Sequence, residues 1–215
     1  MMSTPEHIYC DMDGVLADFL GGAARIVARY ASGAVPDAWL STSRQIQPSL
    51  DTIHATLGTD FQLTERAELT IPAVRQLVLS TISFGAGDFF LSLAPLPGAL
   101  EALWPALWET GRPVSLLSAP ISNRRGASRL TAAQGKRQWA ARWLTPAPEA
   151  VIVVPSREKH LHARCGDRPN LLIDDREETI VRWQDAGGVG IHHDPTAPGR
   201  TLDALHDRFQ GQVPG

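Results

Sequence analysis

Acidic residues stand at two points of the chain where a short apolar run ends, and their spacing suits metal and phosphate chemistry. Asp11 and Asp13 are separated by one residue and precede a glycine, while Asp174 and Asp175 are adjacent. Asp-x-Asp-Gly is typical of a turn, and ligands bind in α/β proteins at the edge where parallel strands end. Carboxylates a few ångströms apart raise one another's pKa, so four at one sheet edge need a counter-charge. The pattern therefore predicts a bound cation.

The expected cation is Mg²⁺. The ligands are oxygen atoms, no His/Cys cluster occurs at metal-binding spacing, and Mg²⁺ commonly shares its coordination shell with a phosphate. Beside such an ion, Asp11 can attack phosphorus and form a covalent intermediate. Asp13 can protonate the leaving oxygen and later accept a proton from water. Ser118, backbone N–H groups and either Lys136 or Lys159 can bind the transferring phosphoryl group.

A layered scaffold is predicted to position these residues. Apolar runs alternate with segments of helical periodicity, which implies βαβ units and a mainly parallel sheet. We expect strands over 7–10, 113–117, 151–154, 171–173 and 189–192, with helices over 19–30, 99–110 and 136–144. The fold class is therefore α/β, with a three-layer, Rossmann-like core formed by residues 1–18 and 88–215.

Residues 19–87 are predicted to form a small helical cap inserted after the first strand. Helical stretches over 50–57 and 73–82 are separated by proline and glycine, and no convincing strand occurs between them.

Composition narrows the classes of function. The chain has 215 residues, 43% of them apolar and 20% charged, which is enough to bury a core. A net charge of −3 predicts no extended nucleic-acid surface, although a small anion can still bind in a pocket. The chain begins without a signal-peptide pattern and has no apolar stretch of about 18 residues, so we expect a cytoplasmic protein without a membrane segment.

The remaining residues with chemical potential have ordinary interpretations. Cys10 and Cys165 are too few for a disulfide framework. Four histidines have no third metal ligand at a fixed spacing and are expected to be surface or loop residues: His160, His162, His192 and His193. Two tryptophan pairs at helical spacing are consistent with packing or with a homodimer surface: Trp104 with Trp108, and Trp139 with Trp143.

Taken together, the motifs resemble those of the haloacid dehalogenase (HAD) superfamily of aspartyl-phosphate phosphatases. The resemblance is carried by Asp-Met-Asp-Gly-Val at 11–15, Ser118, an intervening lysine, and Leu-Ile-Asp-Asp ending at Asp175. Within that superfamily the closest resemblance is to the 5'(3')-deoxyribonucleotidases. It is carried by five blocks in order: 11–22, 89–100, 116–121, Lys136 followed by Trp139, and 171–176.

The resemblance implies a role for each matching position. Asp11 matches the nucleophile and Asp13 the acid/base. The implied Mg²⁺ ligands are the Asp11 side chain, the Asp13 carbonyl and Asp175, with Asp174 close by or acting through water. A protein of this kind would hydrolyse phosphomonoesters through an aspartyl-phosphate.

Phosphate and base contacts are implied in the same way. Ser118 and Ala119 match the phosphate-binding pair, although Ala119 stands where a hydroxyl residue is usual. Lys159 matches the phosphate-facing lysine and Lys136 a second lysine. Phe19 and Phe84 match aromatic residues that face the nucleobase. The expected substrate is a small phosphorylated molecule. Nucleoside monophosphates are the leading class, and deoxyribonucleotides lead within it. The alternatives are another phosphometabolite, a nucleic-acid terminal phosphate, or a regulatory protein that binds metal or phosphate without turnover.

Overall fold

A computed structural model describes residues 5–32, 48–84, 86–121 and 130–209. Contacts divide the chain into two compact units. The core unit contains Met1–Asp18, Ala94–Pro120 and Arg137–Gly215, and the helical unit contains Phe19–Leu93 and Ile121–Lys136. The helical unit therefore includes residues 88–93 and 121–136, which the sequence pattern had assigned to the core.

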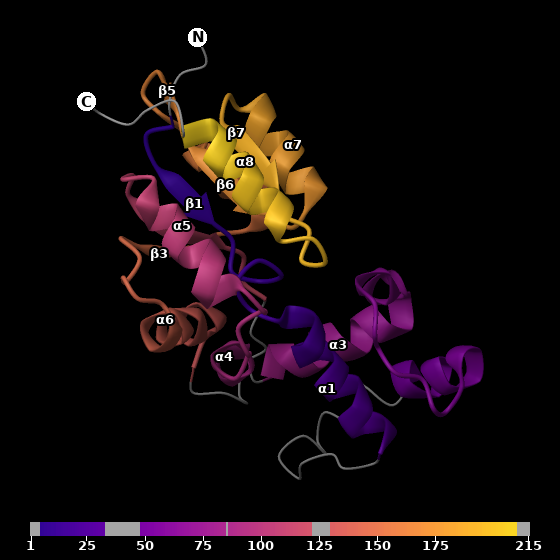
Figure 1. Ribbon diagram of the computed structural model, residues 1–215. Coiled ribbons are helices and arrows are strands. Elements are labelled where there is room, and N and C mark those ends of the chain that lie inside the picture. The colour runs from indigo at the N-terminus through magenta and orange to yellow at the C-terminus, as the bar shows by residue number, and fades with distance from the viewer. Residues whose placement is uncertain (1–4, 33–47, 85, 122–129, 210–215) are drawn as a thin grey trace. The chain divides into compact units, whose positions relative to one another are not determined.

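The core unit is built on a parallel sheet, which confirms the predicted α/β class (Figure 1). Its strand order is β3-β2-β1-β6-β7, so β1 is central and pairs with β2 on one side and β6 on the other. The strands are β1 Ile8–Cys10, β2 Val114–Ser118, β3 Val151–Val153, β6 Leu171–Asp174 and β7 Val189–His192. All five occur where the apolar runs predicted them.

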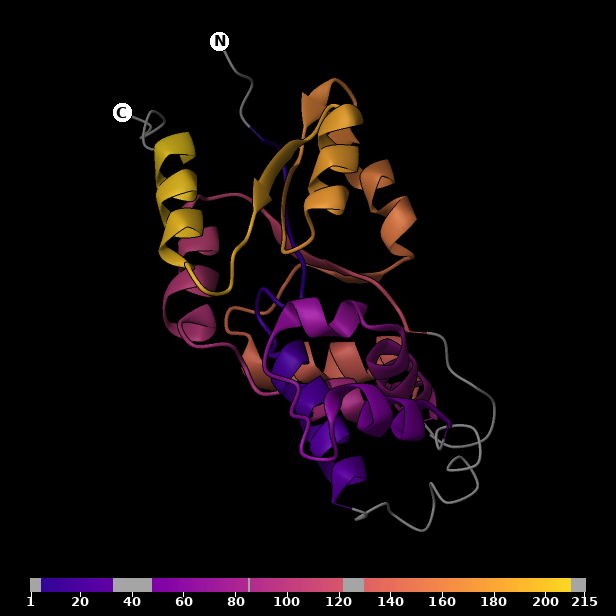
Figure 2. The same cartoon turned by 90° about the vertical axis from the view of Figure 1, so that its right-hand side faces the viewer.

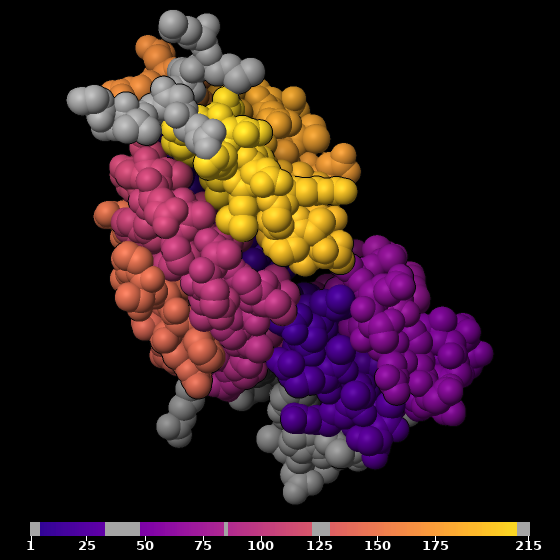
Figure 3. All heavy atoms as spheres, viewed as in Figure 1, coloured from indigo at the N-terminus to yellow at the C-terminus, as the bar shows by residue number. Residues whose placement is uncertain are grey.

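Helices cover both faces of this sheet. Figure 2 shows α5 and α8 on one side, with α7 and the 3₁₀ helix η3 on the other. Figure 3 shows α5 and α8 side by side on the surface of the core unit. The bounds are η2 Ala99–Leu103, α5 Trp104–Glu109, α6 Ala132–Trp143, η3 Ser156–His162, α7 Glu177–Asp185 and α8 Gly199–Phe209. Among the described residues, none of the helices could cross a membrane, since none combines enough length with enough apolar character.

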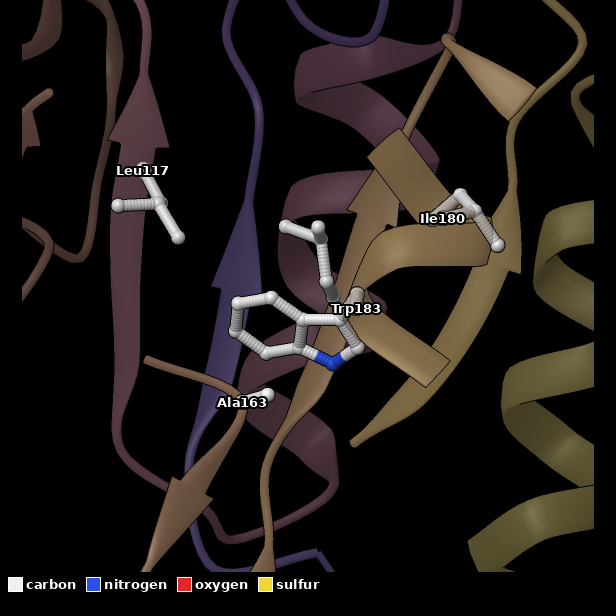
Figure 4. Close-up of a cluster of buried hydrophobic side chains, with 5 residues drawn as sticks. Leu117, Ala163, Ile180 and Trp183 are labelled. Atoms are coloured by element: carbon white, nitrogen blue, oxygen red, sulfur yellow. The ribbon is translucent and has the colours of Figure 1, made fainter. Parts of the chain in front are cut away.

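The face of the sheet that carries η3 and α7 is packed around Trp183. Trp183, Ile180, Leu172, Leu117 and Ala163 form a buried cluster, and Figure 4 shows the indole between Ile180 and Leu117. The indole N–H also donates to the carbonyl of Asn170 at 3.2 Å. This cluster fixes η3 and α7 against the strands, and so fixes the segments on either side of the acidic pair.

Several parts of the core unit were not predicted, among them the 3₁₀ helix η3. Residues 164–169 form a small antiparallel hairpin of β4 (Arg164–Cys165) and β5 (Arg168–Pro169), which turns at Gly166 with φ +58°. The helix α8 follows a proline-rich segment that hid its periodicity.

Both cysteines are free, with Cys10 buried in β1 and Cys165 exposed. Trp104 and Trp139 are buried, so these two tryptophans serve packing.

The described residues of the helical unit contain no strand. Its helices are α1 Phe19–Ala31, η1 Arg66–Thr70, α3 Pro72–Phe84 and α4 Ala86–Leu91, and residues 48–57 are also helical. In α1 the buried residues include Ala23, Ile26 and Val27, which recur at helical spacing along one face.

Two glycines explain why residues beyond 87 belong to the helical unit. A Cβ atom at Gly135 would overlap the backbone of Gly87, and one at Gly87 would overlap Leu130. The start of α6 thus lies directly against the start of α4, at a distance that only glycine permits.

Replacing Gly135 by Ala is expected to lower the free energy of unfolding by about 1–3 kcal/mol, because the added methyl meets rigid backbone. For a chain of this size the midpoint of thermal unfolding would fall by several degrees. Gly199→Ala is the matched control, since a Cβ there has nothing within 4 Å. Equal midpoints for the two variants would contradict the close contact.

Candidate active site

Three carboxylates from the core unit meet at the carboxyl edge of the sheet. Asp11 directly follows β1, Asp174 is the last residue of β6, and Asp175 comes next. The two segments are joined by a hydrogen bond of 2.8 Å from the Asp11 N–H to the carbonyl of Ile173. All three side chains are buried, and each offers one oxygen within 4.8 Å of the others. The distance between Asp11 and Asp175 is thus compatible with one shared cation.

Lys159 of η3 supplies a positive charge to this cluster. Its Nζ lies 3.1 Å from Oδ1 of Asp11 and 2.7 Å from Oδ2 of Asp174. The side chain is only 2% exposed. Burial acts to lower the pKa of Lys159, but the two carboxylates outweigh it and the pKa is raised overall. The lysine is therefore a stable cation between two acids.

Backbone groups fix the directions of the two carboxylates that Lys159 contacts. The N–H of Met12 donates to Oδ1 of Asp11 at 2.8 Å, and the N–H of Arg176 donates to Oδ1 of Asp174 at 2.9 Å. These bonds come from the turns that end β1 and β6, so the orientation of each acid follows from the local chain.

Three buried carboxylates gathered in one cluster fit a divalent cation. Lys159 offers one positive charge beside two of them. Burial, together with the charge of Asp11, raises the pKa of Asp174 to about 6 against the opposing effects of Lys159 and of the Arg176 N–H. Buried oxygen donors with surplus negative charge are what Mg²⁺ requires. Asp11, Asp174 and Asp175 are the residues that would hold it.

Stabilisation by Mg²⁺ is expected to depend on pH. Because the pKa of Asp174 rises from 3.8 to about 6 on folding, the metal-free folded protein binds more protons than the unfolded chain in that window. Its free energy of unfolding should therefore fall as the pH rises from about 4 to about 6. Mg²⁺ needs the ionised acid, so it should raise the unfolding midpoint more at about pH 7.5 than at about pH 5. Thermal scans with and without MgCl₂ at constant ionic strength measure this, and an equal shift at both values would contradict it.

The strand register places the other predicted residues of the core unit, Asp13, Ser118 and Ala119, at the same end of the sheet as the acids. Asp13 lies in the turn after β1, which is closed by a 2.9 Å bond from the Gly14 N–H to the carbonyl of Ala17. Ser118 is the last residue of β2 and is buried, and Ala119 follows it. Since Cys10 is level with Leu116 across the two strands, Ser118 comes level with the turn that carries the acids.

Three predicted residues belong to the helical unit. Lys136 is buried there, with its Nζ 4.1 Å from the centre of the Phe90 ring. Phe19 begins α1, and its half-buried ring meets the Phe89 ring edge-on with centroids 5.6 Å apart. Phe84 ends α3, and its side chain lies outside the described residues. Their roles towards phosphate and base remain predictions, whereas Lys159 is seen against the carboxylates.

Solved structures with the same fold were found, although no family profile and no curated protein sequence matches the chain. A hydrolase from Streptococcus pneumoniae TIGR4 is 15% identical over 95% of this chain and 100% of its own, with a TM-score of 0.50. A protein described as a HAD-hydrolase, YfnB from Bacillus subtilis, was solved bound to magnesium; it is 14% identical over 96% and 99%, with a TM-score of 0.53. A protein from Clostridium difficile described as a phosphatase is 13% identical over 89% and 86%, with a TM-score of 0.50.

At such identities the similarity shows the fold. The chain has the Rossmann-like fold of HAD-type hydrolases and phosphatases, with a candidate acidic metal-binding cluster at the edge of the sheet.

Proposed function

We propose that the protein is a Mg²⁺-dependent phosphomonoesterase that works through an aspartyl-phosphate on Asp11. One observation carries the proposal: the buried Asp11 carboxylate lies within reach of two further acids and 3.1 Å from the ammonium group of Lys159. Clustered carboxylates form a site for a hard metal ion. A lysine beside the attacking carboxylate offsets the repulsion between that carboxylate and an incoming phosphate.

Each residue has a defined part in the proposed reaction. The Asp11 carboxylate forms a bond to phosphorus while the bond to the ester oxygen breaks, and Asp13 gives that oxygen its proton. Asp13 then takes a proton from water as the water oxygen attacks the same phosphorus. Inorganic phosphate leaves and the Asp11 carboxylate is restored. When bound, Mg²⁺ supplies positive charge for the phosphate oxygens.

Ser118 and Lys159 complete the electrostatic environment of the transferring group. Ser118 ends the strand beside β1 and would donate its hydroxyl to a phosphate oxygen. Lys159 is held by Asp11 and Asp174 before substrate binds, so its charge is already oriented when the transition state forms.

Nucleoside monophosphates are the proposed substrates. The five sequence blocks that resemble 5'(3')-deoxyribonucleotidases support this choice. The half-buried ring of Phe19, set against Phe89, also supports it, because an aromatic ring that is not fully buried is suited to contact with a planar base. Lys136 is proposed as a second phosphate-binding lysine on the same resemblance.

The test is phosphate release from a panel of substrates with and without MgCl₂. The panel contains nucleoside 5'- and 3'-monophosphates, sugar phosphates, an aryl phosphate and an oligonucleotide with a terminal phosphate. Preference for the nucleotides would support the full proposal, and preference for sugar phosphates would replace the substrate class. Mg²⁺ binding without turnover on any member would show a binding protein instead of an enzyme.

A further inference from the structure

His192, the last residue of β7, reaches the acidic pair from the neighbouring strand. Asp174 and His192 are level across the parallel pair of β6 and β7. The N–H of His193 donates to the carbonyl oxygen of Asp174 at 3.0 Å. One residue further, Nε2 of His192 lies 3.2 Å from the carbonyl oxygen of Asp175. The carbonyl of Asp174 is thus held by the backbone N–H of His193, and the carbonyl of Asp175 by the side chain of His192.

The chemistry of this second contact defines the state of the imidazole. A carbonyl oxygen only accepts, so Nε2 carries the proton and donates it. The neutral Nε2–H tautomer and the imidazolium both meet this condition, and the contact therefore does not depend on the charge of His192. The bond fixes the peptide that follows Asp175, where β6 has ended and the chain turns into α7.

We infer that His192 is a positioning residue for the metal site. Its hydrogen bond restrains the backbone at Asp175 and keeps that carboxylate directed towards Asp11 and Asp174. The inference rests on the proposed function, in which Asp175 is a Mg²⁺ ligand. Residues that orient metal ligands through a hydrogen bond typically change metal affinity about 10- to 100-fold when replaced. His192 itself is exposed, so its removal leaves no cavity in the core.

The experiment compares His192→Leu with His192→Gln in the full chain. Leucine removes the donor, whereas the glutamine amide can donate to the same carbonyl. Titration calorimetry with MgCl₂ gives the Kd, and the Mg²⁺ concentration for half-maximal phosphate release gives a second value. His206→Leu, at an exposed position on α8, is the control. We expect the leucine variant to bind Mg²⁺ about tenfold more weakly, and the glutamine and control variants to stay within about threefold of the parent protein.

The outcomes separate this inference from the proposed function. The inference is supported if the parent protein binds Mg²⁺ tightly and only His192→Leu binds it weakly. The unfolding midpoints of all the proteins without metal should then be equal. Equal Kd values for the parent and His192→Leu would overturn the inference and leave the proposed function standing. A glutamine variant as weak as the leucine variant, with a lowered midpoint in both, would show a structural role and overturn it. A parent protein that binds no Mg²⁺ would overturn both.

Discussion

Asp11→Asn is expected to lower phosphate release by about 10⁴-fold or more while the protein remains folded. The amide is a far weaker nucleophile than a carboxylate and a poorer ligand for Mg²⁺. Its oxygen can still accept the Met12 N–H, which now reaches Oδ1 of Asp11 at 2.8 Å. Removing one of three clustered carboxylates also relieves repulsion, so the unfolding midpoint in the absence of metal should not fall.

Single-turnover phosphate release and thermal unfolding measure the two parts of this expectation. Asp203→Asn, on the exposed part of α8, is the matched control and should leave both unchanged. An Asp11→Asn protein that keeps a tenth or more of the parent rate would exclude Asp11 as the nucleophile. A folded and inactive variant would exclude general damage as the cause.

Lys159→Met should reduce both stability and activity. The substitution keeps the length of the side chain but leaves three buried carboxylates without the cation that now lies 3.1 and 2.7 Å from two of them. Removing one partner from a buried ion pair costs about 3–5 kcal/mol of unfolding free energy. Activity should fall by about 10²- to 10³-fold, because one charge facing the phosphate is lost.

The conditions under which Lys159→Met is measured sharpen the test. Its loss of stability should be larger at about pH 8 than at about pH 5, since protonated acids need no counter-charge. Saturating Mg²⁺ should restore part of the stability and little of the activity. Denaturant unfolding of this variant and of Arg157→Met, whose side chain on the same helix is 79% exposed, provides the comparison. Equal stability of the two variants would show that Lys159 is not the main counter-charge.

The sheet and the position of the acids could be predicted from the sequence because both depend on local pattern. Apolar runs bounded by turn residues mark all five strands. Parallel strands then bring their carboxyl ends together without further information, which is why Asp11 and Asp175 could be placed at one edge. The signal for the helical insertion after residue 18 was also local, since proline and glycine separate its helical stretches in the sequence.

What the sequence could not decide depends on contacts between distant segments. Lys159 and Lys136 are equivalent as residue types, and only the packing of η3 against β2 and α7 brings Lys159 to the acids. The boundary of the helical unit depends on the approach of Gly87 to Gly135, which no periodicity reveals. His192 was expected to be a surface or loop residue, and no pattern indicates that its ring reaches Asp175.

The order of the strands also has a consequence for how the molecule is made. β1 occurs near the start of the chain, yet its partners begin at Val114 and Leu171, so both of its pairings close very long loops. Such non-local pairing slows folding. During synthesis Asp11 can therefore contact Lys159 and Asp174 only after these two residues have been added to the chain. The acidic cluster cannot assemble before residue 175 has been synthesised.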